Sequence, residues 1–166
     1  MSATASLTLL TIEDDAAVRQ SIAAYFQDSG FTVLEAADGL EGEAMFRRAQ
    51  PDVVLADLRM PKQDGLVVIA AIRAASPETP IIVVSGTGKL EDAIGAVRLG
   101  AWDYVTKPIV DMADLELTVQ QVLERARLIR ENRRYQEHLQ EMVRERTAEL
   151  AAANVALQAD IVERQR

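Results

Sequence analysis

The sequence has no cysteine and only one histidine, His138. The first absence excludes disulfides and thiolate metal sites, and one histidine is too few for a histidine-based metal centre. No apolar run approaches the roughly 20 residues that cross a bilayer. The first six residues lack the basic start and apolar core of a signal peptide. We therefore expect no membrane partner and a cytoplasmic location, with His138 as a solvated side chain.

The chain also lacks an excess of basic residues. Its formal net charge is -8 at pH 7, so direct binding of nucleic acid through a basic surface is not expected. Hydrophobic residues make up 49% and charged residues 27% of the 166 residues, as in an ordinary globular protein. This length suits one domain with an extension.

Glycine and proline are missing from the end of the chain. The last glycine is Gly100 and the last proline is Pro108, and the 58 residues that follow contain neither. These residues are rich in good helix formers. A helix from Asp114 to Arg166 would be about 80 Å long, whereas a domain of this size is about 35 Å across. Most of that helix must therefore extend beyond the domain.

Five short apolar runs alternate with segments of helical spacing before Pro108. Apolar runs without polar alternation are typical of strands buried on both faces of a parallel sheet. The pattern predicts an α/β, flavodoxin-like sheet of five parallel strands in the order 2-1-3-4-5, with helices on both faces. The expected strands are 7–12, 32–36, 53–57, 81–84 and 102–106, and the expected helices are 16–28, 40–49, 66–75, 90–99 and one that begins near Asp111 or Asp114.

Polar residues stand where these strands end. The first strand ends at Glu13-Asp14-Asp15, the third at Asp57, the fourth at Ser85 and the fifth at Lys107. Ligands of open parallel sheets bind beyond the carboxyl ends of the strands, so we expect these side chains around one crevice. Carboxylates about 4 Å apart repel by roughly 4 kcal/mol, so the cluster needs a cation or a proton. Oxygen ligands alone favour a hard ion, and Mg²⁺ is the expected cofactor.

This set of residues suits phosphoryl transfer. Asp57 can attack a phosphoryl group and become an acyl phosphate. Mg²⁺ and Lys107 would neutralise the phosphoryl oxygens, and the Ser85 hydroxyl would donate to one of them. Each part also has a simpler interpretation, since the acids at 13–15 could only cap the next helix and Ser85 could be a turn residue. Their occurrence together favours the chemical interpretation.

Residues 7–125 resemble the receiver domain of bacterial two-component response regulators. The resemblance is carried by Glu13-Asp14-Asp15, by Asp57 with Pro61 four residues later, by Asp64-Gly65, by Ser85-Gly86, and by Tyr104 three residues before Lys107-Pro108. It implies that Asp57 accepts a phosphoryl group from a sensor histidine kinase. It also implies a signalling switch rather than an enzyme, because no output catalytic domain follows in this chain.

The resemblance further implies a role for each residue of the metal site. Asp14, Asp57 and the backbone carbonyl of Arg59 would ligate Mg²⁺, and Glu13 would act mainly through water. The Arg59 side chain, two residues after the acceptor, is expected at the mouth of the site, where it bears on the lifetime of the phosphate.

The phosphate-binding and switch residues are implied in the same way. Ser85, with Gly86 beside it, would move toward the phosphoryl group that Lys107 binds, and Tyr104 would swing inward behind it. Ser85 stands where the family more often has threonine, which preserves the hydroxyl. The Lys107–Pro108 bond is expected to be cis, a roughly 5% event for such bonds. The face formed by the fourth helix, fifth strand and fifth helix would then change its preferred partner.

Two other functions stay open at this stage. The chain could be a phosphorylation-independent dimeric adaptor or scaffold with a receiver-like platform. It could also be an enzyme on a related fold. An aspartate-nucleophile phosphatase needs a second acid where Arg59 stands, and a flavodoxin-type site needs a hydroxyl- and glycine-rich loop where the acids at 13–15 stand. Both observations disfavour an enzyme.

Residues 126–166 are expected to form a coiled-coil or signalling-helix linker and to make the chain a homodimer. Mostly apolar residues recur along this helix at alternating spacings of three and four, as in the heptad seam of a coiled coil, with one extra step of four (a stutter) near Arg146. Val143 offers an alternative position for the seam in the same region. A solvated helix is the simpler alternative. The unbroken pattern at Arg166 suggests a piece of a longer chain. Residues 144–157 resemble linkers ahead of sensor, kinase, cyclase or phosphatase domains, and the receiver resembles stress sigma-factor adaptor regulators. The seam consists of Leu128, Asn132, Tyr135, Leu139, Met142, Arg146, Leu150, Ala153, Leu157 and Ile161.

Overall fold

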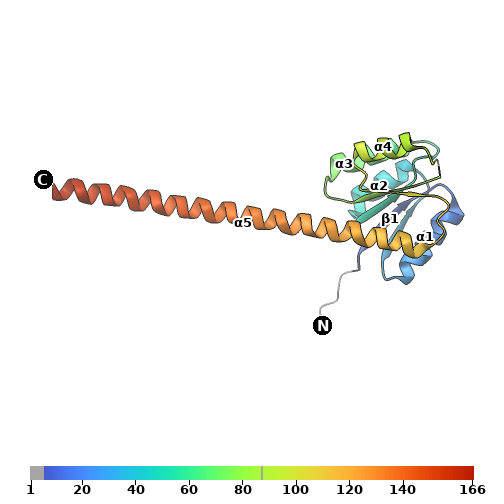
Figure 1. Ribbon diagram of the computed structural model, residues 1–166, viewed down its shortest axis with the longest axis horizontal. Helices are drawn as coiled ribbons and strands as arrows, with labels where there is room; N and C mark the ends of the chain where they lie inside the picture. The colour runs from blue at the N-terminus through green and yellow to red at the C-terminus, as the bar shows by residue number, and fades with distance from the viewer. Residues whose placement is uncertain (1–5, 87) are drawn as a thin grey trace. The chain divides into compact units, whose positions relative to one another are not determined.

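Strands and helices alternate along the chain in the computed structural model, which describes residues 6–86 and 88–166 (Figure 1). The strands are β1 (Thr8–Ile12), β2 (Thr32–Ala36), β3 (Val53–Ala56), β4 (Ile81–Ser85) and β5 (Asp103–Thr106). The helices are α1 (Ala16–Asp28), α2 (Gly39–Ala49), α3 (Gly65–Ala75), α4 (Leu90–Leu99) and α5 (Met112–Arg164). The predicted α/β class is confirmed.

The strands form one parallel sheet in the order β2-β1-β3-β4-β5, as predicted. The register pairs Ile12 of β1 with Ala56 of β3, and the Asp57 N–H donates to the Ile12 carbonyl at 3.0 Å. This register places the residues that follow β1 directly beside Asp57. The strand order reverses direction between β1 and β3, which is where open sheets of this kind bind ligands.

Helices cover both faces of the sheet, and one apolar cluster lies between the sheet and the helices on each face. On one face, α2, α3 and α4 pack on the sheet through residues such as Phe46, Ile69 and Ala96. On the other, α1 and the first turns of α5 pack through residues such as Phe26 and Val119. β3 and β4 are buried along their whole length, which is why their sequences are apolar without alternation.

Aspartates cap several helices, and these caps set small differences from the predicted bounds. Asp15, Asp38 and Asp64 each accept backbone N–H groups at the start of α1, α2 and α3. The Asp64 cap begins α3 at Gly65, one residue before the predicted start. Of the two predicted caps of α5, Asp111 accepts the Ala113 N–H at 2.9 Å, and the helix begins at Met112 because of it.

The chain divides into two compact units, of which the first ends at Arg127 and the second is Leu128–Arg166. The second unit is helical as far as Arg164, and each of its residues is exposed in the single chain. The long C-terminal helix is thus confirmed, whereas its pairing as a coiled coil stays a prediction. Within the described residues, no helix has both the length and the apolar character needed to span a membrane.

Candidate functional site

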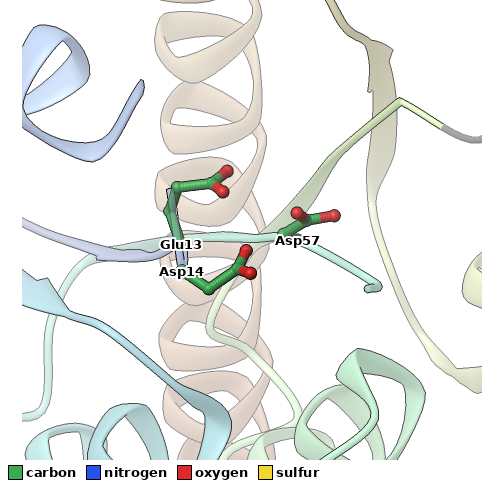
Figure 2. A group of neighbouring side chains, drawn as sticks. All are labelled: Glu13, Asp14 and Asp57. Carbon is green, nitrogen blue, oxygen red and sulfur yellow. The ribbon is translucent and has the colours of Figure 1, made fainter. Parts of the chain in front are cut away.

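Three carboxylates gather at the carboxyl ends of β1 and β3 (Figure 2). Glu13 and Asp14 follow β1, Asp57 follows β3, and each offers an oxygen that lies within 4.8 Å of the others. Glu13 and Asp57 are buried, whereas Asp14 is exposed. In Figure 2 the carboxylate of Asp14 points toward that of Asp57, and Glu13 reaches in from the same strand end. The parallel register of β1 and β3 therefore produces the acidic cluster that the sequence predicted.

Lys107 neutralises part of this cluster from the end of β5. Its Nζ lies 2.5 Å from Glu13 Oε2 and 2.9 Å from Asp57 Oδ2. The second Asp57 oxygen, Oδ1, accepts the backbone N–H of Arg59 at 3.2 Å. Asp57 thus has one oxygen on an ammonium group and the other on a backbone donor, which fixes the orientation of its carboxylate.

Burial and charge have opposite effects on the pKa values of Glu13 and Lys107. Burial raises the pKa of Glu13, and this effect exceeds the lowering by the Lys107 hydrogen bond and the Asp15 backbone N–H. Burial lowers the pKa of Lys107, but hydrogen bonds to Glu13 and Asp57 outweigh it, so the net pKa of Lys107 is raised. The raised pKa of Lys107 keeps its side chain a cation, while burial makes ionisation of Glu13 less favourable than in water.

Ser85 ends β4 with its hydroxyl buried. Its Oγ has no hydrogen-bond partner among residues 6–86 and 88–166, although its carbonyl accepts the Lys107 N–H at 3.0 Å. A buried hydroxyl without a partner costs roughly 1–3 kcal/mol. Ser85 and Gly86 line one cavity with Asp57 and Lys107, so a group with acceptor oxygens placed there would satisfy this hydroxyl.

The remaining residues of the predicted switch are Tyr104 and Pro108. Tyr104 is half-buried and packs against the apolar cluster beneath α2, α3 and α4. The Lys107–Pro108 peptide bond is cis. The tail residues of the predicted seam belong to the second unit.

Arg59 and Lys89 also line this cavity, which has a volume of about 460 Å³. The Arg59 guanidinium is mostly exposed and pairs with Asp92 of α4 across 3.3 Å. The sequence predicted that Arg59 lies close to the acceptor but gave no sign of Asp92 or Lys89, because both come more than 25 residues later in the chain. Arg59 is therefore tethered to α4 beside the acceptor.

The donor set fits a hard cation. Glu13, Asp14 and Asp57 offer only oxygen atoms, and the chain has no cysteine to supply a thiolate. Three clustered carboxylates carry more negative charge than Lys107 alone balances. An oxygen-rich site with excess negative charge is what Mg²⁺ selects, so the residues present suit that ion.

Comparisons with known proteins agree with this geometry. Residues 9–120 match the family described as the response regulator receiver domain. The chain is 36% identical over 121 residues to the regulatory protein AtoC of Escherichia coli, covering 73% of this chain and 26% of AtoC. It is 32% identical over 119 residues to the DNA-binding dual master transcriptional regulator RpaA of Synechocystis, covering 70% of this chain and 49% of RpaA. The chain thus spans only a quarter to a half of the length of these relatives.

Solved structures give the same result. A response regulator receiver domain protein from Clostridium thermocellum superposes with a TM-score of 0.70 at 31% identity, over 74% of this chain and 98% of that one. NtrX from Brucella abortus superposes with a TM-score of 0.72 at 30% identity, over 76% of this chain and 28% of that one. With the sheet order, the acidic cluster and the matched residues 9–120 in agreement, this chain belongs to the response regulator receiver domain family.

Proposed function

We propose that this chain is a phosphorylation-dependent switch of a two-component system, in which residues 7–125 accept the phosphoryl group and residues 126–166 transmit the signal. The observation that carries the proposal is the setting of Asp57. Its carboxylate lies between a lysine ammonium and two further acids, beside a buried serine hydroxyl that lacks a partner in the described chain.

In the proposed reaction, an Asp57 oxygen attacks the phosphorus atom of a histidine kinase phosphohistidine. A P–O bond forms, the P–N bond breaks, and the imidazole leaves with the electron pair. Lys107 already touches Asp57 Oδ2 at 2.9 Å, so it is in place to bind a phosphoryl oxygen and to offset the added charge. The Ser85 hydroxyl donates to a second phosphoryl oxygen.

A separate reaction, hydrolysis, resets the switch. A water oxygen attacks the phosphorus, the bond to Asp57 breaks, and inorganic phosphate leaves as the carboxylate is restored. Asp14, Asp57 and the Arg59 carbonyl would hold Mg²⁺, with Glu13 acting through water. When bound, Mg²⁺ supplies positive charge for the phosphoryl oxygens. The chain acts as a switch in the cytoplasm, without membrane or nucleic-acid contacts of its own.

The output of the switch is proposed to pass through α4, β5 and α5. Movement of the Ser85 hydroxyl toward the phosphate would vacate space at the end of β4, into which Tyr104 would turn. Tyr104 lies on β5 beside Val83 of β4, two residues before Ser85 in the sheet register, so a movement of Ser85 occurs close to it. The altered face then biases the homodimer formed through the C-terminal helix.

Beryllofluoride, which mimics an aspartyl phosphate, provides the test. With Mg²⁺ present, added beryllofluoride should shift the amide NMR signals of Ser85, Gly86 and Tyr104 in the wild-type protein. The size of these shifts should reach a maximum as the concentration of beryllofluoride increases. Asp57→Asn should show no such shifts, and the wild-type protein without Mg²⁺ should show none. Identical shifts in Asp57→Asn would rule out Asp57 as the acceptor, and a wild-type spectrum that stays unchanged would favour the adaptor without phosphorylation.

A further inference from the structure

The exposed apolar residues of the second unit follow an 11-residue repeat. Leu128, Leu139, Leu150 and Ile161 are each 11 positions apart, and all four side chains are exposed on α5. Eleven residues make three turns of 3.67 residues, so on an α-helix these side chains form one column that drifts by only about 20° per repeat. The column therefore stays on one side of the helix through residues 128–161.

Two further columns flank these leucines, at the positions four and seven residues after each of them. Side chains at such spacings share a helix face. We call the three columns together the 11-residue stripe. Its flanking members are Asn132, Val143 and Asn154 in one column and Tyr135, Arg146 and Leu157 in the other. Arg146, the charged member, pairs within its own helix with Glu149 across 2.7 Å. The 11-residue stripe thus needs no stutter, and it differs from the heptad-like seam in having Val143 and Asn154 in place of Met142 and Ala153.

The two asparagines indicate what covers the stripe. Asn132 and Asn154 occupy equivalent positions of two repeats. If two copies of this helix lie parallel and in register, each asparagine faces its own counterpart. An asparagine side chain both donates and accepts, so each pair can hydrogen-bond across the seam. A buried asparagine of this kind fixes the register of a coiled coil.

An antiparallel pair cannot match the same positions. Bringing the leucine columns together would set Leu139 opposite Leu150. Asn132 would then face Leu157, and its amide would be buried without a partner. Because the stripe repeats identically along one helix and its polar members match only themselves, the partner it fits is a second copy of this chain in parallel orientation.

We propose that residues 128–166 form a parallel, in-register, two-stranded coiled coil with an 11-residue repeat. Such a repeat gives a straight to right-handed supercoil, opposite in hand to a heptad coil. This inference rests on the homodimer in the proposed function and specifies its geometry. It does not depend on phosphorylation of Asp57.

Cysteine scanning of the full chain tests the geometry, because the protein has no cysteine of its own. Under oxidation, Leu139→Cys, Leu150→Cys and Ile161→Cys should each form a disulfide between copies, since their Cα atoms approach across the seam. Met142→Cys and Ala153→Cys are the matched controls, because the heptad-like seam contains these two residues and the 11-residue stripe has Val143 and Asn154 in their place. They should cross-link at least tenfold more slowly than Val143→Cys and Asn154→Cys. Faster cross-linking at 142 and 153 than at 143 and 154 would overturn the 11-residue repeat.

Mixing Leu139→Cys with Leu150→Cys tests the orientation. A parallel pair yields only the two homodisulfides, whereas an antiparallel pair yields the mixed disulfide and would contradict the proposal. Light scattering on each reduced variant establishes its oligomeric state first. A monomer at every concentration would overturn both this inference and the proposed homodimer, while leaving acceptance of a phosphoryl group at Asp57 as a separate question.

Discussion

Replacing Gly65 by alanine should disturb the site at Asp57 through the backbone. A Cβ on Gly65 would lie 2.2 Å from the Asp57 carbonyl oxygen and 2.5 Å from Leu58 Cα. Ordinary contacts begin near 3.4 Å, so α3 and the segment after β3 would have to separate by about 1 Å. Overpacking costs about 1–3 kcal/mol. We expect a loss of stability at the upper end of this range, about 3 kcal/mol, because both contacted atoms belong to the backbone and cannot move away by a side-chain rotation.

Urea unfolding followed by the fluorescence of Trp102, the only tryptophan, measures this cost within the first unit. Gly95→Ala in α4 is the matched control, because nothing lies within 4 Å of its added Cβ. That variant should gain about 0.5–1 kcal/mol from lower backbone entropy in the unfolded chain. Gly65→Ala should also bind Mg²⁺ more weakly. If its stability stays within about 0.5 kcal/mol of the wild-type protein, the close approach of α3 to Asp57 is wrong.

Three further predictions concern the polar residues of the site. Ser85→Ala should leave the free energy of unfolding unchanged or raise it by up to about 1 kcal/mol, because it removes a buried hydroxyl without a described partner. The same variant should bind beryllofluoride about tenfold or more weakly in isothermal titration calorimetry. A clear loss of stability in Ser85→Ala would contradict this expectation. Because the pKa of Glu13 is raised in the folded protein, folded Glu13 keeps its proton to a higher pH than unfolded Glu13 does. The stability that this group contributes is therefore complete below its ordinary pKa of 4.5 and is lost as pH rises above it. Glu13→Gln in metal-free buffer should therefore gain stability over the wild-type protein as pH rises from 4 to 7 in urea titrations, and a gain that shrinks over this range would refute the assignment. Asp92→Asn should release the Arg59 guanidinium and decrease the rate at which the phosphoryl group is lost by up to about fivefold, which corresponds to the free energy of an exposed ion pair. If Asp92→Asn has an equal effect in an Arg59→Ala background, Arg59 is excluded as the cause.

The sequence was sufficient to predict the fold chiefly because the central strands β3 and β4 are apolar almost throughout and buried at every position. Val53–Ala56 is apolar at every position and buried at every position. Parallel strands buried on both faces require crossover helices, and the alternation of elements then leaves few topologies. The position of Asp57 next to Glu13 followed from that topology alone.

The contacts within the site could not be predicted in the same way. The sequence placed Lys107 at the end of β5, but its contact with both Glu13 and Asp57 depends on the reach of a flexible side chain across β4. The Arg59–Asp92 pair joins a loop to α4, and no local pattern encodes such a pair. The buried hydroxyl of Ser85 likewise depends on packing from several elements.

Intact-protein mass spectrometry after incubation with acetyl phosphate and Mg²⁺ tests the central claim most directly. The wild-type protein should gain the mass of one phosphoryl group, and fragmentation after borohydride reduction should place the modification on Asp57. Asp57→Ala should gain nothing, while Asp52→Ala, which removes an aspartate that instead binds the Thr8 N–H at 2.7 Å, should be labelled like the wild-type protein. Equal labelling of Asp57→Ala and the wild-type protein would contradict the account.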